Sequence, residues 1–169
     1  SRFASAHSYA MVGGGGNPDI DVMVVYTPEA RDQVGGVVAI ENLIESAITS
    51  CNIANENTLH PVRQRLLHTA LVNYTSAGRS TDIDRLKTDG DGYLDEVHAW
   101  RNTYGTDFVG LFTVDSSIPY GGGIASMPGA FSVCSVVSVD SLLVYAHETG
   151  HNLNCNHNDA SFTGASGRR

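Results

Sequence analysis

Two histidines stand four residues apart in the apolar stretch between Leu142 and His151. At about 100° per residue, His147 and His151 lie about 40° apart around a helix, one turn above the other. Two imidazoles placed in this way can bind one metal ion. Glu148 lies beside them, where a carboxylate can take a proton from metal-activated water. The spacing predicts that this segment folds as a helix with both histidines on one side.

A third ligand is available if the chain turns back sharply after this helix. His157 follows His151 by six residues, and a continuing helix would carry it away from the ion. Asn154 stands where the turn is needed, and asparagine tolerates the left-handed backbone conformation better than most residues. The whole pattern is expected by chance about 4 × 10⁻⁴ times in a chain of this composition. It therefore favours a metal site over an amphipathic helix whose histidines align by accident.

The rest of the chain alternates strand-like and helix-like segments. Apolar patterns predict strands at 20–26, 62–74, 107–114, 124–126 and 131–139. Helices are expected at 28–57, at 80–104 in two pieces separated by 89–92, and after Asp140, which can cap the last one. Thr27 and Pro28 mark a helix start, and the glycines at 35–36 weaken its first turns. This order predicts an α/β or α+β fold with helices packed on one mixed sheet.

The composition describes a single acidic domain. The chain has 169 residues, of which 41% are hydrophobic, enough for one buried core. A net charge of −8 without a basic stripe argues against nucleic-acid binding and against anionic membranes. We expect no apolar run of the roughly 20 residues that span a bilayer. Residues 1–18 end in a glycine run and are expected to be a flexible leader or the remnant of a pro-segment, with the folded domain at 19–169.

The segment at 147–157 resembles the HExxHxxGxxH signature of the metzincin zinc peptidases. Four further segments are similar to the catalytic domain of the reprolysin (adamalysin) group, in particular its bacterial secreted members: 21–30, 92–98, 123–125 and 130–133. The resemblance covers about residues 19–159. It implies a mixed, mostly parallel, five-stranded twisted sheet with an antiparallel edge strand, packed with long helices that include the zinc-binding one.

The same resemblance implies roles for particular residues. His147, His151 and His157 would be the ligands of one catalytic Zn²⁺, and Glu148 the general base. An extended peptide would pair with the antiparallel edge strand, whose short apolar segment and free edge suit that role. The residues expected to bind substrate in this way are Gly123, Ile124, Ala125 and Ser126.

Two features depart from the family pattern. Asn154 stands where the signature has glycine, which is tolerable at a left-handed turn but costs some stability. Metzincins also place a methionine-containing turn after the third histidine, whereas the last methionine here is Met127 and twelve residues follow His157. The C-terminal subdomain of the expected catalytic domain, 19–169, is therefore interpreted as truncated or incomplete.

Three cysteines permit one disulfide. If the last helix folds back along the strand that contains Cys134, then Cys134 and Cys155 reach the same edge of the sheet. We favour that pair, with Cys51 a buried thiol on its helix. Three buried thiols, or a partner outside the printed sequence, are equally good alternatives.

The acidic stretch from Asp82 to Glu96 allows calcium but does not have the spacing of a calcium-binding loop. An EF-hand needs glycine at its sixth position, where Lys87 stands. Helix caps in a solvated loop are therefore the better interpretation of these carboxylates.

The sequence predicts a secreted, monomeric zinc endopeptidase that acts on protein or peptide substrates, without nucleic acid or membrane partners. One alternative is a non-catalytic zinc-binding fragment, or a partner-binding domain of metallopeptidase origin. Another keeps hydrolysis but has Asp159 in place of His157 as the third ligand. Glu148 favours catalysis, because zinc binding alone has no use for a carboxylate at that position.

Overall fold

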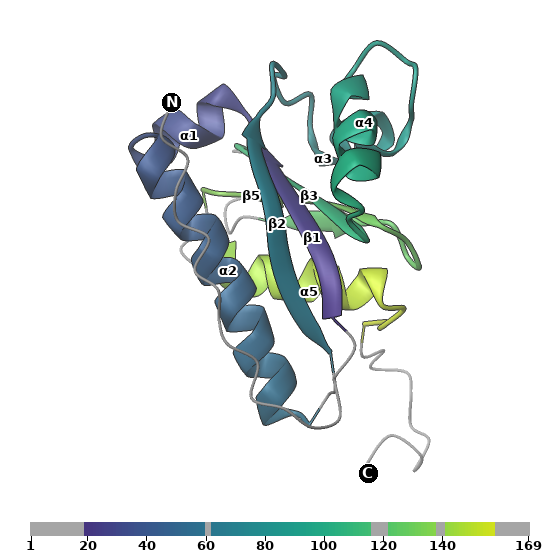
Figure 1. Ribbon diagram of the computed structural model, residues 1–169. Coiled ribbons are helices and arrows are strands. Elements are labelled where there is room, and N and C mark those ends of the chain that lie inside the picture. The colour runs from purple at the N-terminus through teal and green to yellow at the C-terminus, as the bar shows by residue number, and fades with distance from the viewer. Residues whose placement is uncertain (1–18, 60–61, 116–121, 138–140, 158–169) are drawn as a thin grey trace.

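The computed structural model describes residues 19–59, 62–115, 122–137 and 141–157 (Figure 1). The expected leader at 1–18, the proposed cap Asp140 and the alternative ligand Asp159 lie outside these residues.

Five strands form one sheet in the order β2-β1-β3-β5-β4. Their bounds are β1 (Asp19–Tyr26), β2 (Arg63–Leu71), β3 (Phe108–Thr113), β4 (Gly123–Ala125) and β5 (Phe131–Ser135). All neighbouring strands are parallel except β4, which pairs antiparallel with β5. The predicted mostly parallel sheet with an antiparallel edge strand is confirmed.

Within the described residues, five helices accompany the sheet: α1 (Pro28–Val34), α2 (Val37–Asn57), α3 (Arg79–Lys87), α4 (Asp95–Tyr104) and α5 (Ser141–Asn152). The Thr27 side chain accepts a hydrogen bond from the Ala30 backbone N–H, and Pro28 is the first helical residue, as predicted. The single helix expected at 28–57 is instead two. Gly35 and Gly36 have φ values of 102° and 116°, outside helical geometry, and these angles separate α1 from α2.

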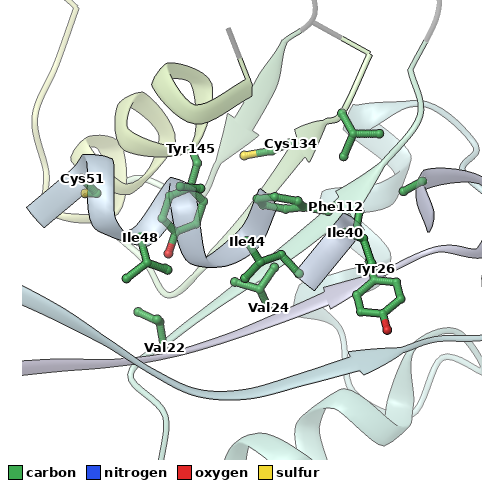
Figure 2. Close-up of a cluster of buried hydrophobic side chains, with 13 residues drawn as sticks. Val22, Val24, Tyr26, Ile40, Ile44, Ile48, Cys51, Phe112, Cys134 and Tyr145 are labelled. Atoms are coloured by element: carbon green, nitrogen blue, oxygen red, sulfur yellow. The ribbon is translucent and has the colours of Figure 1, made fainter. Parts of the chain in front are cut away.

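Each face of the sheet has its own apolar core. Successive side chains of β1 point to opposite faces, so the strand contributes to both cores. Val22 and Val24 pack with residues of α2 and α5 in the cluster drawn in Figure 2. Met23 and Val25 pack with residues of α3 and α4 on the other face. The fold therefore has three layers, with α2 and α4 on opposite sides of the sheet (Figure 1).

Helix α2 corrects one expectation from the sequence. Among the helices of the described residues, it is long and apolar enough, by length and composition alone, to cross a membrane. Its Ile40 and Ile44 side chains are fully buried in the protein core. Ala47, Ile48 and Cys51 on the same helix are also buried there. Helix α2 thus contributes its buried side chains to the same core as α5.

Strands β2, β3 and β5 are shorter than the apolar patterns predicted, and the early end of β5 decides the position of Cys134. Strand β5 ends at Ser135, so Cys134 lies near the end of the strand from which the chain proceeds to α5. Cys155 follows the opposite end of α5, where the Asn152 side chain contacts the carbonyl of Phe131 at the start of β5. The expected Cys134–Cys155 disulfide is therefore not present. All three cysteines are free, with Cys134 buried and Cys155 exposed.

The carboxylates between Asp82 and Glu96 do not form the expected helix caps, because neither α3 nor α4 has a side-chain cap hydrogen bond. Both carboxylate oxygens of Asp95 accept backbone N–H groups, from Gly90 at 2.8 Å and from Gly92 at 3.1 Å. Asp82 is fully buried and accepts hydrogen bonds from the Tyr74 hydroxyl and the Ala77 backbone N–H. These carboxylates stabilise the loops that begin α3 and α4.

A buried polar chain fixes α5 to α2 and β2. The Tyr145 hydroxyl donates to Gln64 Oε1 at 2.8 Å, and the Gln64 amide donates to Cys51 Sγ at 3.2 Å. Cys51 Sγ in turn lies 3.6 Å from the Thr149 hydroxyl. All four side chains belong to buried residues, in agreement with the predicted burial of Cys51. Because buried polar groups are costly when unpaired, this chain holds α5 in one rotational setting.

The polar chain predicts the effect of Tyr145→Phe. The substitution leaves Gln64 Oε1 buried without its donor, so the free energy of unfolding should fall by about 1–3 kcal/mol. Urea unfolding followed by circular dichroism measures the change. Leu143→Ala is the control, because Leu143 is on the same helix and 66% exposed, and should change stability by less than about 0.5 kcal/mol. Equal stability of Tyr145→Phe and the unmodified chain would contradict this role.

Candidate functional site

Helix α5 presents His147 and His151 on one of its faces, as the four-residue spacing predicted. The Nε2 atoms of the two rings lie 3.0 Å apart. His147 is exposed and His151 half-buried, while Tyr145 and Thr149, on another face, are in the core. The rigid, buried side of the helix therefore positions two imidazoles at the surface.

The predicted left-handed turn follows the helix. Asn154 has a φ of 69°. Two hydrogen bonds close the turn, from the Asn154 N–H to the His151 carbonyl at 2.8 Å and from the Cys155 N–H to the Gly150 carbonyl at 2.9 Å. This pair of bonds is the Schellman pattern that ends many helices. It reverses the chain and brings His157 back beside the helix.

The three histidine side chains meet at one point. His157 Nε2 lies 3.0 Å from Nε2 of His147 and 3.0 Å from Nε2 of His151. Three imidazole nitrogens in mutual contact cannot all form hydrogen bonds with one another, because each carries either one proton or one lone pair. Three lone pairs can, however, point at one cation. A tetrahedral zinc ion with bonds of about 2.0–2.1 Å separates its nitrogens by about 3.3 Å, so the triangle fits such an ion.

A backbone contact sets the tautomer of one ring. His151 Nδ1 lies 2.7 Å from the Cys155 carbonyl oxygen, which can only accept, so Nδ1 carries the proton. Nε2 of His151 is then left with its lone pair directed at the other two rings. Burial lowers the pKa of His147, and the neighbouring charges of His151 and His157 lower it further. Both effects favour the neutral imidazoles that metal binding requires.

Glu148 lies next to the histidines in sequence but points into the protein. It is 5% exposed, against 66% for Leu143 on the same helix. Burial raises the pKa of Glu148 to about 6, while the positive charges of His151 and Arg79 oppose that rise. A carboxyl group with such a pKa can both accept and release a proton near neutral pH.

Strand β4 lies directly against Glu148. The antiparallel pairing of β4 with β5 uses the backbone groups of Gly122, Ile124 and Ser126, because Gly122 and Ser126 are bonded to Ser135 and Phe131 at 3.0 Å. In an antiparallel ladder the residues between these pairs direct their N–H and C=O groups to the other side. Gly123 and Ala125 therefore point their backbone groups to the free edge of the sheet. Of the four residues predicted to bind a peptide, these two have the required orientation.

Asn152 is a site residue that the sequence reasoning missed. It is buried, and its amide nitrogen donates to the carbonyls of Ser126 at 2.9 Å and Phe131 at 3.0 Å. This contact fastens the end of α5 to the connection between β4 and β5. The four-residue spacing from Glu148 to Asn152 could have indicated this position, because it places both residues on one face of the helix.

Arg79 was also missed. It is the first residue of α3, on a helix that packs against β4 and β5, and its side chain is exposed. It forms no ion pair with the described residues of the chain, yet its positive charge acts on Glu148. Nothing in the local sequence at 79 indicates a position near α5, which lies more than sixty residues further along the chain.

The chain is similar in sequence to known proteins. The reprolysin-type model of metallo-peptidase family M12 matches residues 17–168. Two bacterial relatives are each named peptidyl-Asp metalloendopeptidase. The protein from Xanthomonas campestris is 29% identical over 158 residues, and the one from Stenotrophomonas maltophilia strain K279a is 30% identical over 156 residues. Each alignment covers 90% of this chain and 37% of the relative, so the chain spans little more than a third of their length.

A solved structure shares the fold. A chain in the structure of a chaperone–substrate complex superposes with a TM-score of 0.72 and 21% sequence identity. The match covers 84% of this chain and 25% of the other chain. The similarity establishes that the three-layer arrangement around α5 is a fold already found in a larger protein.

The histidine triangle predicts which substitutions abolish metal binding. His157→Ala, like His147→Ala or His151→Ala, should reduce bound zinc from about one ion per chain to well below half, because catalytic zinc needs three protein ligands. Metal analysis after dialysis measures the content. His68→Gln is the control, since His68 stacks on Tyr104 at 4.1 Å and lies on β2, at the other edge of the sheet. Unchanged zinc in His157→Ala would point to another third ligand, with Asp159 first to be tested.

Proposed function

The chain belongs to metallo-peptidase family M12, and on that premise we propose that it hydrolyses peptide bonds in proteins as a zinc endopeptidase. His147, His151 and His157 would hold the ion, and Glu148 would be the general base. The observation that carries the proposal is the triangle of three Nε2 atoms at mutual distances of 3.0 Å beside a buried carboxylate. Zinc binding alone would not need that carboxylate.

The residues of the chain divide the reaction between them. Zinc, when bound, supplies a Lewis acid that polarises a carbonyl and lowers the pKa of water toward about 7. Glu148 takes the proton of the attacking water and passes it to the leaving amine. A pKa of about 6 suits this exchange, because the group is mostly ionised at neutral pH and still releases a proton readily. The Cys155 carbonyl keeps His151 in the tautomer that leaves Nε2 free to bind.

The substrate would bind as an added strand. Backbone groups of Gly123 and Ala125 face the free edge of the sheet, and an extended peptide can pair with them. Pairing through main-chain groups binds many sequences alike, which suits an enzyme that acts on proteins. The same pairing would bring the peptide next to Glu148, because β4 lies against that side chain.

Removing the base tests the proposal. The Glu148→Ala chain should retain zinc and lose casein hydrolysis by about 10²-fold or more, because general-base catalysis contributes on that scale. Hydrolysis is measured for both chains at equal zinc content. If both chains hold zinc and neither cleaves, the alternative of a non-catalytic zinc-binding or partner-binding domain replaces the proposal. Secretion and a monomeric state stay predictions from the sequence.

The names of the relatives suggest a preference for aspartate, which we include in the proposal. Arg79 offers a positive charge near Glu148 that is not paired with any described residue. In a chain of net charge −8, such a cation beside the cleaved bond favours an acidic substrate side chain over a neutral one.

Charge removal at Arg79 tests this preference. Arg79→Gln should lower kcat/KM for an aspartate-containing peptide by about fivefold, which is the effect of one solvent-accessible charge pair. The kcat/KM for the corresponding asparagine peptide should stay unchanged. Lys87→Gln is the matched control, because it removes the same charge from the other end of α3. A loss shared equally by both peptides would exclude recognition of aspartate by Arg79.

A further inference from the structure

Gly123 stands where a side chain would collide with Glu148. A Cβ atom built on Gly123 lies 2.5 Å from Glu148 Cγ and 2.6 Å from Glu148 Oε1. These distances are far below the roughly 3.5–4.0 Å of favourable carbon contacts. The backbone of β4 therefore approaches the Glu148 side chain more closely than any other residue type would allow.

The strand cannot simply move away. On one side, the Gly122 carbonyl accepts the Ser135 N–H at 3.0 Å, and Ser126 is bonded to Phe131 at 3.0 Å. At the end of α5, the Asn152 amide binds the carbonyl of Ser126. Strand β4 is thus fixed to β5 along its length and to α5 at its end.

The Glu148 side chain has little room as well. It is 5% exposed, and the buried Cys134 on β5 is close enough for the Glu148 charge to help raise its pKa, after burial itself. The helix backbone that carries Glu148 is held by Tyr145 and Thr149 in the buried polar chain. A side chain at position 123 would therefore push the Glu148 carboxylate out of its present position beside the histidines.

We propose that Gly123 is a positioning residue, whose missing side chain makes the space in which the Glu148 carboxylate is held between α5 and β4. The inference rests on the proposed function, and it gives Gly123 a role distinct from main-chain pairing with a peptide. A methyl group at 123 would leave the backbone groups of β4 in place and shift the carboxylate. The proton transfer would then suffer more than peptide binding.

Steady-state kinetics test the proposal with Gly123→Ala at equal zinc content. The expected result is a fall in kcat of about 10- to 100-fold with KM changed by less than about twofold, because an error of about 1 Å in the position of a catalytic group costs up to that factor. Gly110→Ala is the control, since a Cβ on this glycine of β3 meets Tyr145 at 3.5 Å, an ordinary contact. A kcat within about twofold of the unmodified chain, or a loss confined to KM, would overturn the proposal.

Melting temperatures of a double variant test the same contact without activity. Gly123→Ala should lower the melting temperature of the unmodified chain, and should have little effect in the Glu148→Ala background, where the colliding atoms are absent. If Gly123→Ala alone does not fold, recovery of folding in the double variant supports the proposal. An equal loss of stability in both backgrounds contradicts it. Should the unmodified chain not cleave casein, the proposed function fails, whereas this measurement still decides the packing role of Gly123.

Discussion

The left-handed turn at Asn154 is the constraint on which the site depends. Without it, the chain would leave α5 in the direction of the helix, and His157 could not reach the other two histidines. The turn is held by two hydrogen bonds within the helix end, and its next residue, Cys155, offers the carbonyl that orients the His151 ring. One local feature thus places the third imidazole and sets the tautomer of the second. Asparagine fills this position at a small cost relative to glycine.

Helix α5 combines the other requirements because its faces have separate tasks. Tyr145 and Thr149 anchor the helix in the core, and His147 and His151 face outward. Glu148 faces Gly123 at the start of β4, and Asn152 contacts the connection between β4 and β5. These pairs are spaced by four residues, so each occupies one face. A shift of the helix would move the ligands, the carboxylate and the peptide edge together. Chemistry and stability are therefore coupled in a single element.

Local signals in the sequence were sufficient for much of this arrangement. The cap at Thr27, the histidine spacing and the turn at Asn154 depend on neighbouring residues, and each was predicted. The end of β5 at Ser135 was not predicted, because strand ends depend on tertiary pairing. The expected Cys134–Cys155 disulfide failed for that reason. The break between α1 and α2 is local, since Gly35 ends α1 in the left-handed conformation, but the glycine pair was interpreted only as a weak point within one helix. Gly123 gave no signal for its contact with Glu148, since a glycine shows its role only when its neighbour in space is known.

X-ray absorption spectroscopy of the zinc-loaded chain measures whether the turn after α5 completes a site of three histidines. We expect a first shell of nitrogen and oxygen at about 2.0–2.1 Å with the scattering pattern of three imidazoles, and the loss of one imidazole in His157→Ala. A zinc–sulfur distance of about 2.3 Å would contradict this expectation, because the exposed thiol of Cys155 would then be a ligand in place of a histidine.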